Sequence, residues 1–255
     1  MTARISSTER HALGQARRKQ LRRQEHAHWR PPARRPSPVA TIAHSMRGRI
    51  SSLVTLKYER MLASPFGFFR GAVAVMAADL AAIPNTGIIS QICGDAHVRN
   101  LGAYAAPDGR LIFDINDFDE TCTAPFEWDL KRMATSLVLA GRENGQKQSA
   151  CRDAVHILAL HYRRLATALA RMPVIELARY QVHRLERVTP VSDALQKAKR
   201  ETPLSTLSRF TVEMKAHKEE PARRRFKKEP PLLTPLPLAQ SRAVLASFAR
   251  YRNSL

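Results

Sequence analysis

Three polar residues near the middle of the chain have the types and the spacing for phosphate chemistry. Asp95 and Asn100 have four residues between them and follow a short apolar run, and Asp117 comes after two further runs of strand length. Two metal-bound oxygens and a nearby carboxylate base are what in-line phosphoryl transfer needs, because positioning and charge neutralisation carry most of that catalysis. Asp, four residues and Asn, with a second Asp at a later strand end, is also the order in the kinase template. Together the three residues favour a metal and phosphate site over loop-capping residues.

The segment around these residues is acidic in a strongly basic chain. The chain holds 42 Lys and Arg against 22 Asp and Glu, yet residues 79–129 hold nine acids and two bases. Clustered carboxylates repel one another and raise one another's pKa, so such a cluster usually persists with a cation, and Asp and Asn oxygens suit Mg²⁺. Asp119 and Glu120 are either auxiliary ligands or exposed turn acids. His97 is expected to be a hydrogen-bonded loop residue.

The elements that must position these residues are short. An apolar run at 88–93 has the length of a strand, and Gly94 opens a loop. Two strands at 101–105 and 110–115 are joined by a turn signal and predict a β-hairpin. After a polar turn, Pro125 is expected to begin a helix.

The rest of the chain has helical periodicity. Apolar residues at three- and four-residue steps predict the following helices: 39–56, 68–82, 125–143, 151–169, 174–188, 203–216 and one from Leu238. We therefore expect an α+β fold, predominantly α-helical, with a small β-hairpin that carries the acidic site. The expected domains are a basic, Pro-rich, poorly ordered arm (1–38), a catalytic-loop domain (39–217), a charged and Pro-rich linker (218–238) and the start of a C-terminal segment (239–255).

Several sequence blocks resemble known families. GDAHVRN at 94–100 resembles the catalytic loop of aminoglycoside phosphotransferases and choline kinases, and DFD at 117–119 resembles their metal-binding segment. A closer resemblance is to the uncharacterised, mainly bacterial domain-of-unknown-function family 2252. The blocks similar to that family are SPFGFFRGAVAVMAADLA at 64–81, ICGDAHVRNLG at 92–102, FDINDFDET at 113–121 and EWDLKRMATS at 127–136.

The resemblance to the phosphotransferases implies roles for five residues. Asp95 is the implied catalytic base, and Asn100 and Asp117 are the implied Mg²⁺ ligands. His97 is implied to shape the loop, and Asp129 to be a structural residue at a helix start. The implied activity is transfer of phosphate from ATP to a hydroxyl of a small molecule, on the C-lobe half of a kinase-like fold.

Two features depart from this resemblance. Cys93 stands where the phosphotransferases have a largely structural His, and the ten glycines form no Gly-x-Gly-x-x-Gly or Gly-Lys-Ser/Thr loop. The resemblance implies that the nucleotide-binding lobe follows the catalytic segment, past Leu255. We therefore expect a truncated chain without its ATP-binding lobe, and whether it is active alone stays open.

The basic ends suggest a non-enzymatic alternative. Residues 1–35 hold ten Lys and Arg against two Glu, and residues 197–228 hold eleven against four. Such runs attract polyanions, so the alternative is a basic pseudoenzyme fragment that binds nucleic acid or another polyanion non-specifically. A dinuclear metallophosphoesterase is disfavoured because no Asn precedes a His. The three unpaired cysteines, and the lack of an apolar leader or membrane-length run, indicate a cytoplasmic protein without membrane association.

Overall fold

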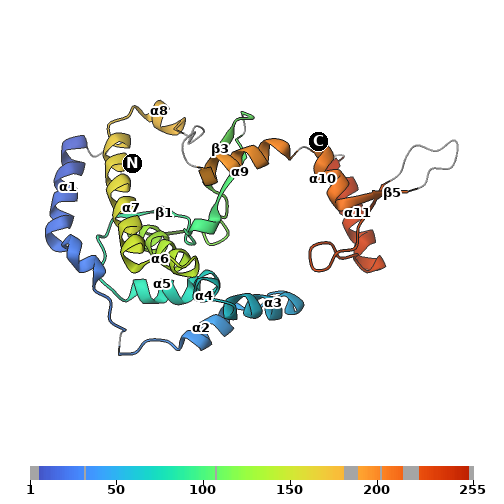
Figure 1. Cartoon of the computed structure of the whole chain (residues 1–255), viewed down its shortest axis with the longest axis horizontal. Helices are drawn as coiled ribbons and strands as arrows, with labels where there is room; N and C mark the ends of the chain where they lie inside the picture. Colours follow the sequence, from blue (N-terminus) through green and yellow to red (C-terminus); the bar gives the residue numbers. More distant parts are fainter. Residues whose placement is uncertain are drawn as a thin grey trace. The chain divides into compact units, whose positions relative to one another are not determined.

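The computed structural model describes residues 6–31, 33–106, 108–180, 189–201, 203–214 and 224–252. It is mostly helical, with three small two-stranded antiparallel sheets among these residues, in agreement with the expected α+β class (Figure 1). The chain divides into two compact units, residues 1–198 and 199–255, so the division falls inside the domain expected over 39–217. Among the helices described, none combines the length and the apolar character of a membrane span.

The first unit begins with a helix in the segment expected to be a poorly ordered arm. Helix α1 (Ser7–Gln20) starts at a capping box, in which Ser6 and Glu9 each accept a hydrogen bond from the other's backbone N–H. A short 3-10 helix, η1 (Arg23–Ala27), follows. A capping box provides hydrogen-bond partners for N–H groups that are otherwise free at the start of a helix. Local hydrogen bonds of this kind stabilise α1, although its sequence has no apolar stripe.

The Pro-rich stretch after η1 is tied to the rest of the unit by one arginine. Arg35 donates to both carboxylate oxygens of Asp79, from Nε at 2.6 Å and from the terminal nitrogen at 2.7 Å. The Arg35 guanidinium also lies 5.4 Å from the centre of the Trp29 ring. A bidentate pair of this kind fixes both the distance and the orientation of the two groups.

Two of the expected helices are each divided into two. Helix α2 (Pro38–Ser45) and helix α3 (Ser51–Leu62) replace one helix over 39–56, because Gly48 adopts a left-handed φ of 75° between them. Helix α4 (Pro65–Gly71) and helix α5 (Val73–Ala81) replace one helix over 68–82. The prediction of single helices was therefore wrong at both places.

The apolar faces of these four helices form a small core. Helix α3 packs against α4, and α2 against α5. The buried residues at the centre are Ile42, Met46, Met61 and Ala72, with Val54 and Val75 packed against them.

Four strands form two pairs, and the loop at 93–100, which holds Asp95, connects β1 to β2. Strand β1 (Ile89–Ile92) pairs with β4 (Cys122–Pro125), and β2 (Leu101–Ala105) pairs with β3 (Leu111–Ile115) in the hairpin that the sequence predicts. Strand β4 was missed, and the helix expected from Pro125 starts later because Pro125 is the last residue of β4. The hairpin and the expected strand at 88–93 are confirmed.

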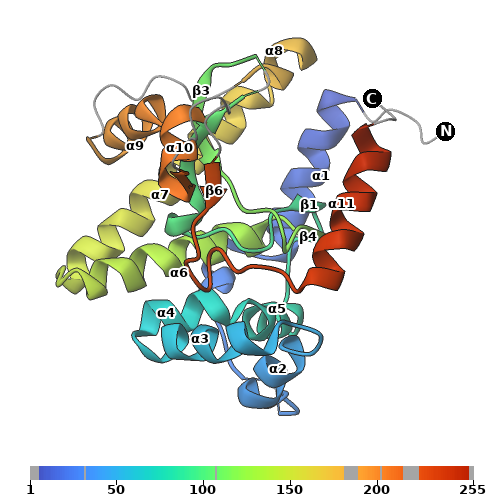
Figure 2. The same ribbon diagram turned by 90° about the vertical axis from the view of Figure 1, so that its right-hand side faces the viewer.

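A helical hairpin completes the first unit. Helix α6 (Glu127–Glu143) and helix α7 (Gln148–Leu169) pack against each other and are joined at Gly145, whose φ is 71° (Figure 2). Helix α6 also packs against α4 and against the 3-10 helix η2 (Val98–Asn100), which ends the acidic loop. Helix α8 (Val174–Ala178) follows, and residues 181–188 of the helix expected over 174–188 lie outside the described residues.

Helix α9 (Thr189–Arg200), which the sequence did not predict, leads into the second unit. There the helix expected over 203–216 stops early: α10 (Pro203–Phe210) is followed by strand β5 (Thr211–Glu213), which pairs with β6 (Arg224–Phe226). Strand β6 lies within the linker expected over 218–238, whose residues 218–223 lie outside the described residues. The last helix, α11 (Leu238–Arg252), confirms the helix expected from Leu238.

Candidate functional site

The loop between β1 and β2 is anchored at its start by a carboxylate of α6. Asp129 accepts hydrogen bonds from the backbone N–H of Cys93 at 2.8 Å and of Gly94 at 3.0 Å, one on each oxygen. Gly94 has a φ of 78°, and a Cβ on it would lie 2.0 Å from the backbone oxygen of Glu120. Only glycine fits this position without displacing the chain. Asp129 thus lies at the helix start and serves the loop's architecture.

The Asp95 side chain forms an ion pair that the sequence did not predict. Its Oδ1 accepts a hydrogen bond from Nε of Arg132 at 2.5 Å, and the two side chains are 15% and 2% exposed. Arg132 also donates to the backbone oxygen of Phe69 at 3.1 Å, and its guanidinium lies 4.3 Å from the centre of the Phe69 ring. Several directed contacts therefore hold the Asp95 carboxylate in one orientation.

His97 is the second partner of Asp95. Its ring is 1% exposed, and its Nε2 lies 3.6 Å from Oδ2 of Asp95. Burial lowers the pKa of His97; Asp95 partly offsets this, and the charges of Arg70 and Arg132 lower the pKa further. The ring meets that of Phe66 edge-on at 6.1 Å between centres. His97 is thus a packed residue of the loop, and not the hydrogen-bonded residue expected: among the described residues its buried Nδ1 has no hydrogen-bond partner, and 3.6 Å is too long for a hydrogen bond from Nε2.

Asn100 is held against Asp95 by the loop itself. It is 4% exposed, and its Nδ2 donates to the backbone oxygen of Asp95 at 3.0 Å. Just before it, the backbone N–H of Val98 donates to Oγ of Ser136 on α6 at 3.2 Å. In the part of the chain that the structure describes, no hydrogen bond to Oδ1 of Asn100 is found beside the one that Nδ2 donates.

Asp117 lies at the same end of the hairpin as Asn100. Leu101 pairs with Ile115, and one residue further the backbone N–H of Asn116 donates to the backbone oxygen of Asn100 at 2.9 Å. Asp117 is the next residue; it is exposed, and its Oδ1 accepts a hydrogen bond from the backbone N–H of Asp119 at 3.4 Å. The structure thus holds the Asn100 side chain against the Asp95 backbone, and the exposed Asp117 follows the residue whose backbone is bonded to Asn100.

These donors fit a cation that the protein holds with few ligands. Among the described residues, no three His, Cys, Asp or Glu side chains lie close enough to bind a metal ion together. The remaining set is one amide oxygen and one carboxylate, with Asp119 exposed in the same turn. Mg²⁺ is often bound through one or two carboxylates with waters that complete its shell, so the residue types present suit that ion.

Glu127 has a different role from the one its position suggests. It lies in the first turn of α6, where acids are usually exposed, yet it is 4% exposed. Its carboxylate accepts hydrogen bonds from the backbone N–H of Thr86 at 2.6 Å and from Oγ1 of Thr86 at 3.0 Å. These hydrogen bonds hold the turn that precedes β1 against the start of α6. Together, Glu127, Asp129 and Arg132 make α6 the element that positions the loop.

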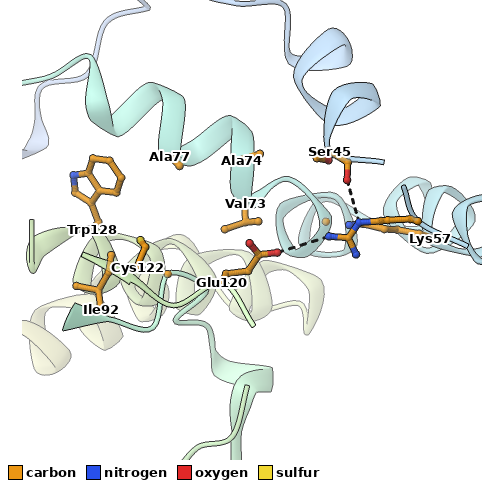
Figure 3. A pocket seen from close by; sticks show the side chains of 12 residues that line it. Ser45, Lys57, Val73, Ala74, Ala77, Ile92, Glu120, Cys122 and Trp128 are labelled. Carbon is orange, nitrogen blue, oxygen red and sulfur yellow. Dashed lines mark hydrogen bonds and ion pairs between the residues drawn. The ribbon is translucent and has the colours of Figure 1, made fainter. Parts of the chain in front are cut away.

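A cavity of about 280 Å³ lies beside the loop (Figure 3). Gly94 and Glu120 line it on the loop side, Arg49 and Lys57 contribute from the α2–α3 connection and α3, and Cys122 and Trp128 contribute from β4 and α6. Sequence reasoning missed this cavity, because Arg49 and Lys57 lie in a helical stretch far from the acidic segment.

The comparisons with known proteins support one family. A family model described as an uncharacterized protein conserved in bacteria, domain of unknown function 2252, matches residues 49–255. Searches of curated proteins and of solved structures found no match. The matched range contains Asp95, Asn100, Asp117 and the cavity.

Proposed function

The chain belongs to the bacterial domain-of-unknown-function family 2252, and we propose that it is an ATP- and Mg²⁺-dependent phosphotransferase of kinase-like fold that acts on a small-molecule hydroxyl. The observation that carries the proposal is the hydrogen bond between Nδ2 of Asn100 and the backbone oxygen of Asp95 at 3.0 Å. This bond supports the proposal because the base and the first cation ligand of such a site must lie side by side, with the second ligand, Asp117, at the neighbouring strand end.

In this proposal Asp95 orients the acceptor and receives its proton. Arg132 occupies Oδ1 of Asp95, and Oδ2, on the side of His97, is left for the acceptor hydroxyl. The hydroxyl oxygen forms a bond to the γ-phosphorus while the bond to the bridging oxygen breaks; ADP leaves and the hydroxyl proton passes to Asp95. Because the transition state is loose, a fixed carboxylate contributes mainly through positioning.

Mg²⁺, when bound with ATP, supplies charge neutralisation at the transferring phosphate. Oδ1 of Asn100 and the carboxylate of Asp117 are the ligands that this chain offers. Asn100 is fixed by its bond to the loop, while Asp117 is exposed and can adjust. We expect Asp119, one residue beyond Phe118, to assist from the same turn.

The test is direct transfer of labelled phosphate. The purified chain is incubated with γ-labelled ATP, Mg²⁺ and a mixture of hydroxylated metabolites, and labelled small molecules are separated and counted. Asp95→Asn should abolish the label in products while its circular dichroism spectrum still shows a folded protein. Equal labelling by wild type and Asp95→Asn, or no labelling by the wild type, contradicts the proposal.

A second candidate function is non-catalytic binding of a polyanion. Arg17, Arg18 and Lys19 occupy the last turn of α1, and Arg225 and Lys228 are exposed around β6. This candidate predicts DNA affinity that falls steeply with salt and is insensitive to Asp117→Ala. Binding without salt dependence would argue against it.

A further inference from the structure

The cavity beside the loop has a polar end and an apolar end. Figure 3 shows Trp128, Ile92 and Cys122 at one end, and Glu120 and Lys57 toward the other. Pockets for drug-sized ligands start at about 300 Å³, so a cavity of about 280 Å³ suits a small metabolite better than a whole nucleotide.

The polar end has more positive than negative charge. Arg49 and Lys57 face one carboxylate, that of Glu120, whose Oε1 lies 3.9 Å from the Arg49 guanidinium. That separation is long for a hydrogen-bonded pair, and both side chains are about half exposed, so the pair is weak. Arg49 also donates to the backbone oxygen of Ser45 at 3.0 Å, which holds it at the cavity edge.

Lys57 differs from Arg49 in its contacts. In the described parts of the chain, its ammonium group makes no hydrogen bond and no ion pair within 4.0 Å. Burial lowers the pKa of Lys57 and the charge of Arg49 lowers it further, while Glu120 and Asp95 partly offset this. A partly buried ammonium next to a second cation gains from any anion that reaches it.

The opposite end provides a surface for an apolar group. Trp128 lines the cavity with Ile92, which is buried, and with the small side chains of Ala74 and Ala77 of α5. An indole surface with aliphatic neighbours favours an aromatic or aliphatic group. The loop residue that lines the cavity is Gly94, directly before Asp95, and the backbone of Glu120 lies against it.

We propose that this cavity binds the acceptor, and that the acceptor is a small hydroxylated organic acid with an apolar body. Its carboxylate lies between Lys57 and Arg49, its apolar body lies against Trp128, and its hydroxyl group faces the loop at Gly94, the residue before Asp95. The role as acceptor rests on the proposed phosphotransferase function; the binding of the acid does not.

The experiment measures binding without ATP, by calorimetry or by ligand-observed NMR on the full chain. The probes are 4-hydroxybenzoate, 4-hydroxyphenylacetate and 3-phenyllactate, each compared with its uncharged amide. We expect at least one acid to bind more tightly than its amide. Lys57→Met should lower the affinity for that acid by about ten- to a hundredfold, which is the effect of losing a charge-assisted hydrogen bond.

Arg60→Met is the matched control, because Arg60 lies one turn after Lys57 on α3, is exposed and does not line the cavity. It should leave the affinity unchanged. The proposal is overturned when no acid binds better than its amide, or when both variants lose affinity equally. It is also overturned when ADP with Mg²⁺ displaces the acid and Lys57→Met lowers the affinity for ADP. In that case the cavity binds nucleotide phosphates.

The two proposals fail separately. If acid binding depends on Lys57 but the wild type transfers no phosphate, the proposed binding site is supported and the proposed phosphotransferase activity is contradicted. If phosphate is transferred to an uncharged alcohol and Lys57→Met still does so, the phosphotransferase activity is supported and the organic acid is contradicted as its acceptor.

Discussion

Arg132 and Asp95, from helix α6 and the β1–β2 loop, form a largely buried ion pair of 2.5 Å between Nε and Oδ1. The pair joins the helix that anchors the loop to the residue proposed as the base. Arg132 is also bonded to Phe69 of α4, so one side chain links three elements. The orientation of Asp95 therefore depends on the packing of α4 and α6 as well as on the loop.

Breaking this pair should cost both stability and activity. Arg132→Met leaves the Asp95 carboxylate without its partner, and removing one member of a buried pair costs about 3–5 kcal/mol. Urea unfolding of Arg132→Met, Asp95→Asn and the double variant forms a double-mutant cycle. We expect the double variant to be much more stable than the sum of the single effects predicts, and additive effects would contradict an energetic link between the two residues.

Gly94 should be far less tolerant of substitution than another glycine with the same backbone conformation. Gly94 and Gly109 have φ values of 78° and 79°, but a Cβ at Gly109 meets nothing within 4 Å, whereas at Gly94 it meets Glu120. Gly109→Ala should cost about 1–2 kcal/mol for the left-handed conformation alone. Gly94→Ala should cost clearly more in urea unfolding, and equal costs would contradict the close approach.

Stability should fall in mild acid partly because of His97. Burial lowers the pKa of His97 from its ordinary value of 6.5, so below that pH the unfolded chain binds a proton that the folded protein does not. The contribution of His97 to the free energy of unfolding is fully present above its ordinary pKa. It is lost as the pH falls through the lowered pKa of the folded protein. His97→Gln should show a smaller loss of unfolding free energy between pH 7.5 and 5.5 than the wild type.

His161→Gln, on an exposed position of α7, is the control for this measurement and should keep the pH dependence of the wild type. A wild-type-like pH dependence in His97→Gln would show that His97 is not protected from protonation in the folded protein.

The three cysteines should differ in reactivity. Cys122 is exposed, while Cys93 and Cys151 are buried, and burial beside Asp129 raises the pKa of Cys93 to about 12. Because the thiolate is the reactive form, iodoacetamide at pH 8 should label Cys122 first. Mass spectrometry of the folded protein should find one modified site, which Cys122→Ser removes. Early labelling of Cys93 would contradict the buried loop.

The hairpin of β2 and β3 could be predicted because it is a local structure. Leu111, Phe113 and Ile115 alternate in the sequence, and a turn signal separates the two strands, so neighbouring residues decide the structure. Strand β4 could not be predicted in this way. It has four residues without alternation and pairs with β1, which lies some 30 residues earlier. Its strand conformation depends on a distant partner.

The chemistry of the site could be predicted only in part, because it also depends on residues that are distant in the sequence. Asp95, Asn100 and Asp117 stand out by type and spacing, but a buried Arg132 looks the same in sequence as a solvated arginine. Its place three residues after Asp129, on the same face of α6, was the available signal. Gly48 was a second such signal, since a glycine inside an apolar period often marks a break.

In the proposed site Asn100 and Asp117 share one divalent cation, and Mn²⁺ titration followed by electron paramagnetic resonance measures this binding. We predict that the wild type with ADP binds Mn²⁺ more tightly than ADP alone does. Asp117→Asn should weaken this binding about tenfold or more, the effect of losing one charged ligand. Asp108→Asn, at the far turn of the same hairpin, should not change it. Mn²⁺ binding that is the same in the wild type and in Asp117→Asn would contradict the account.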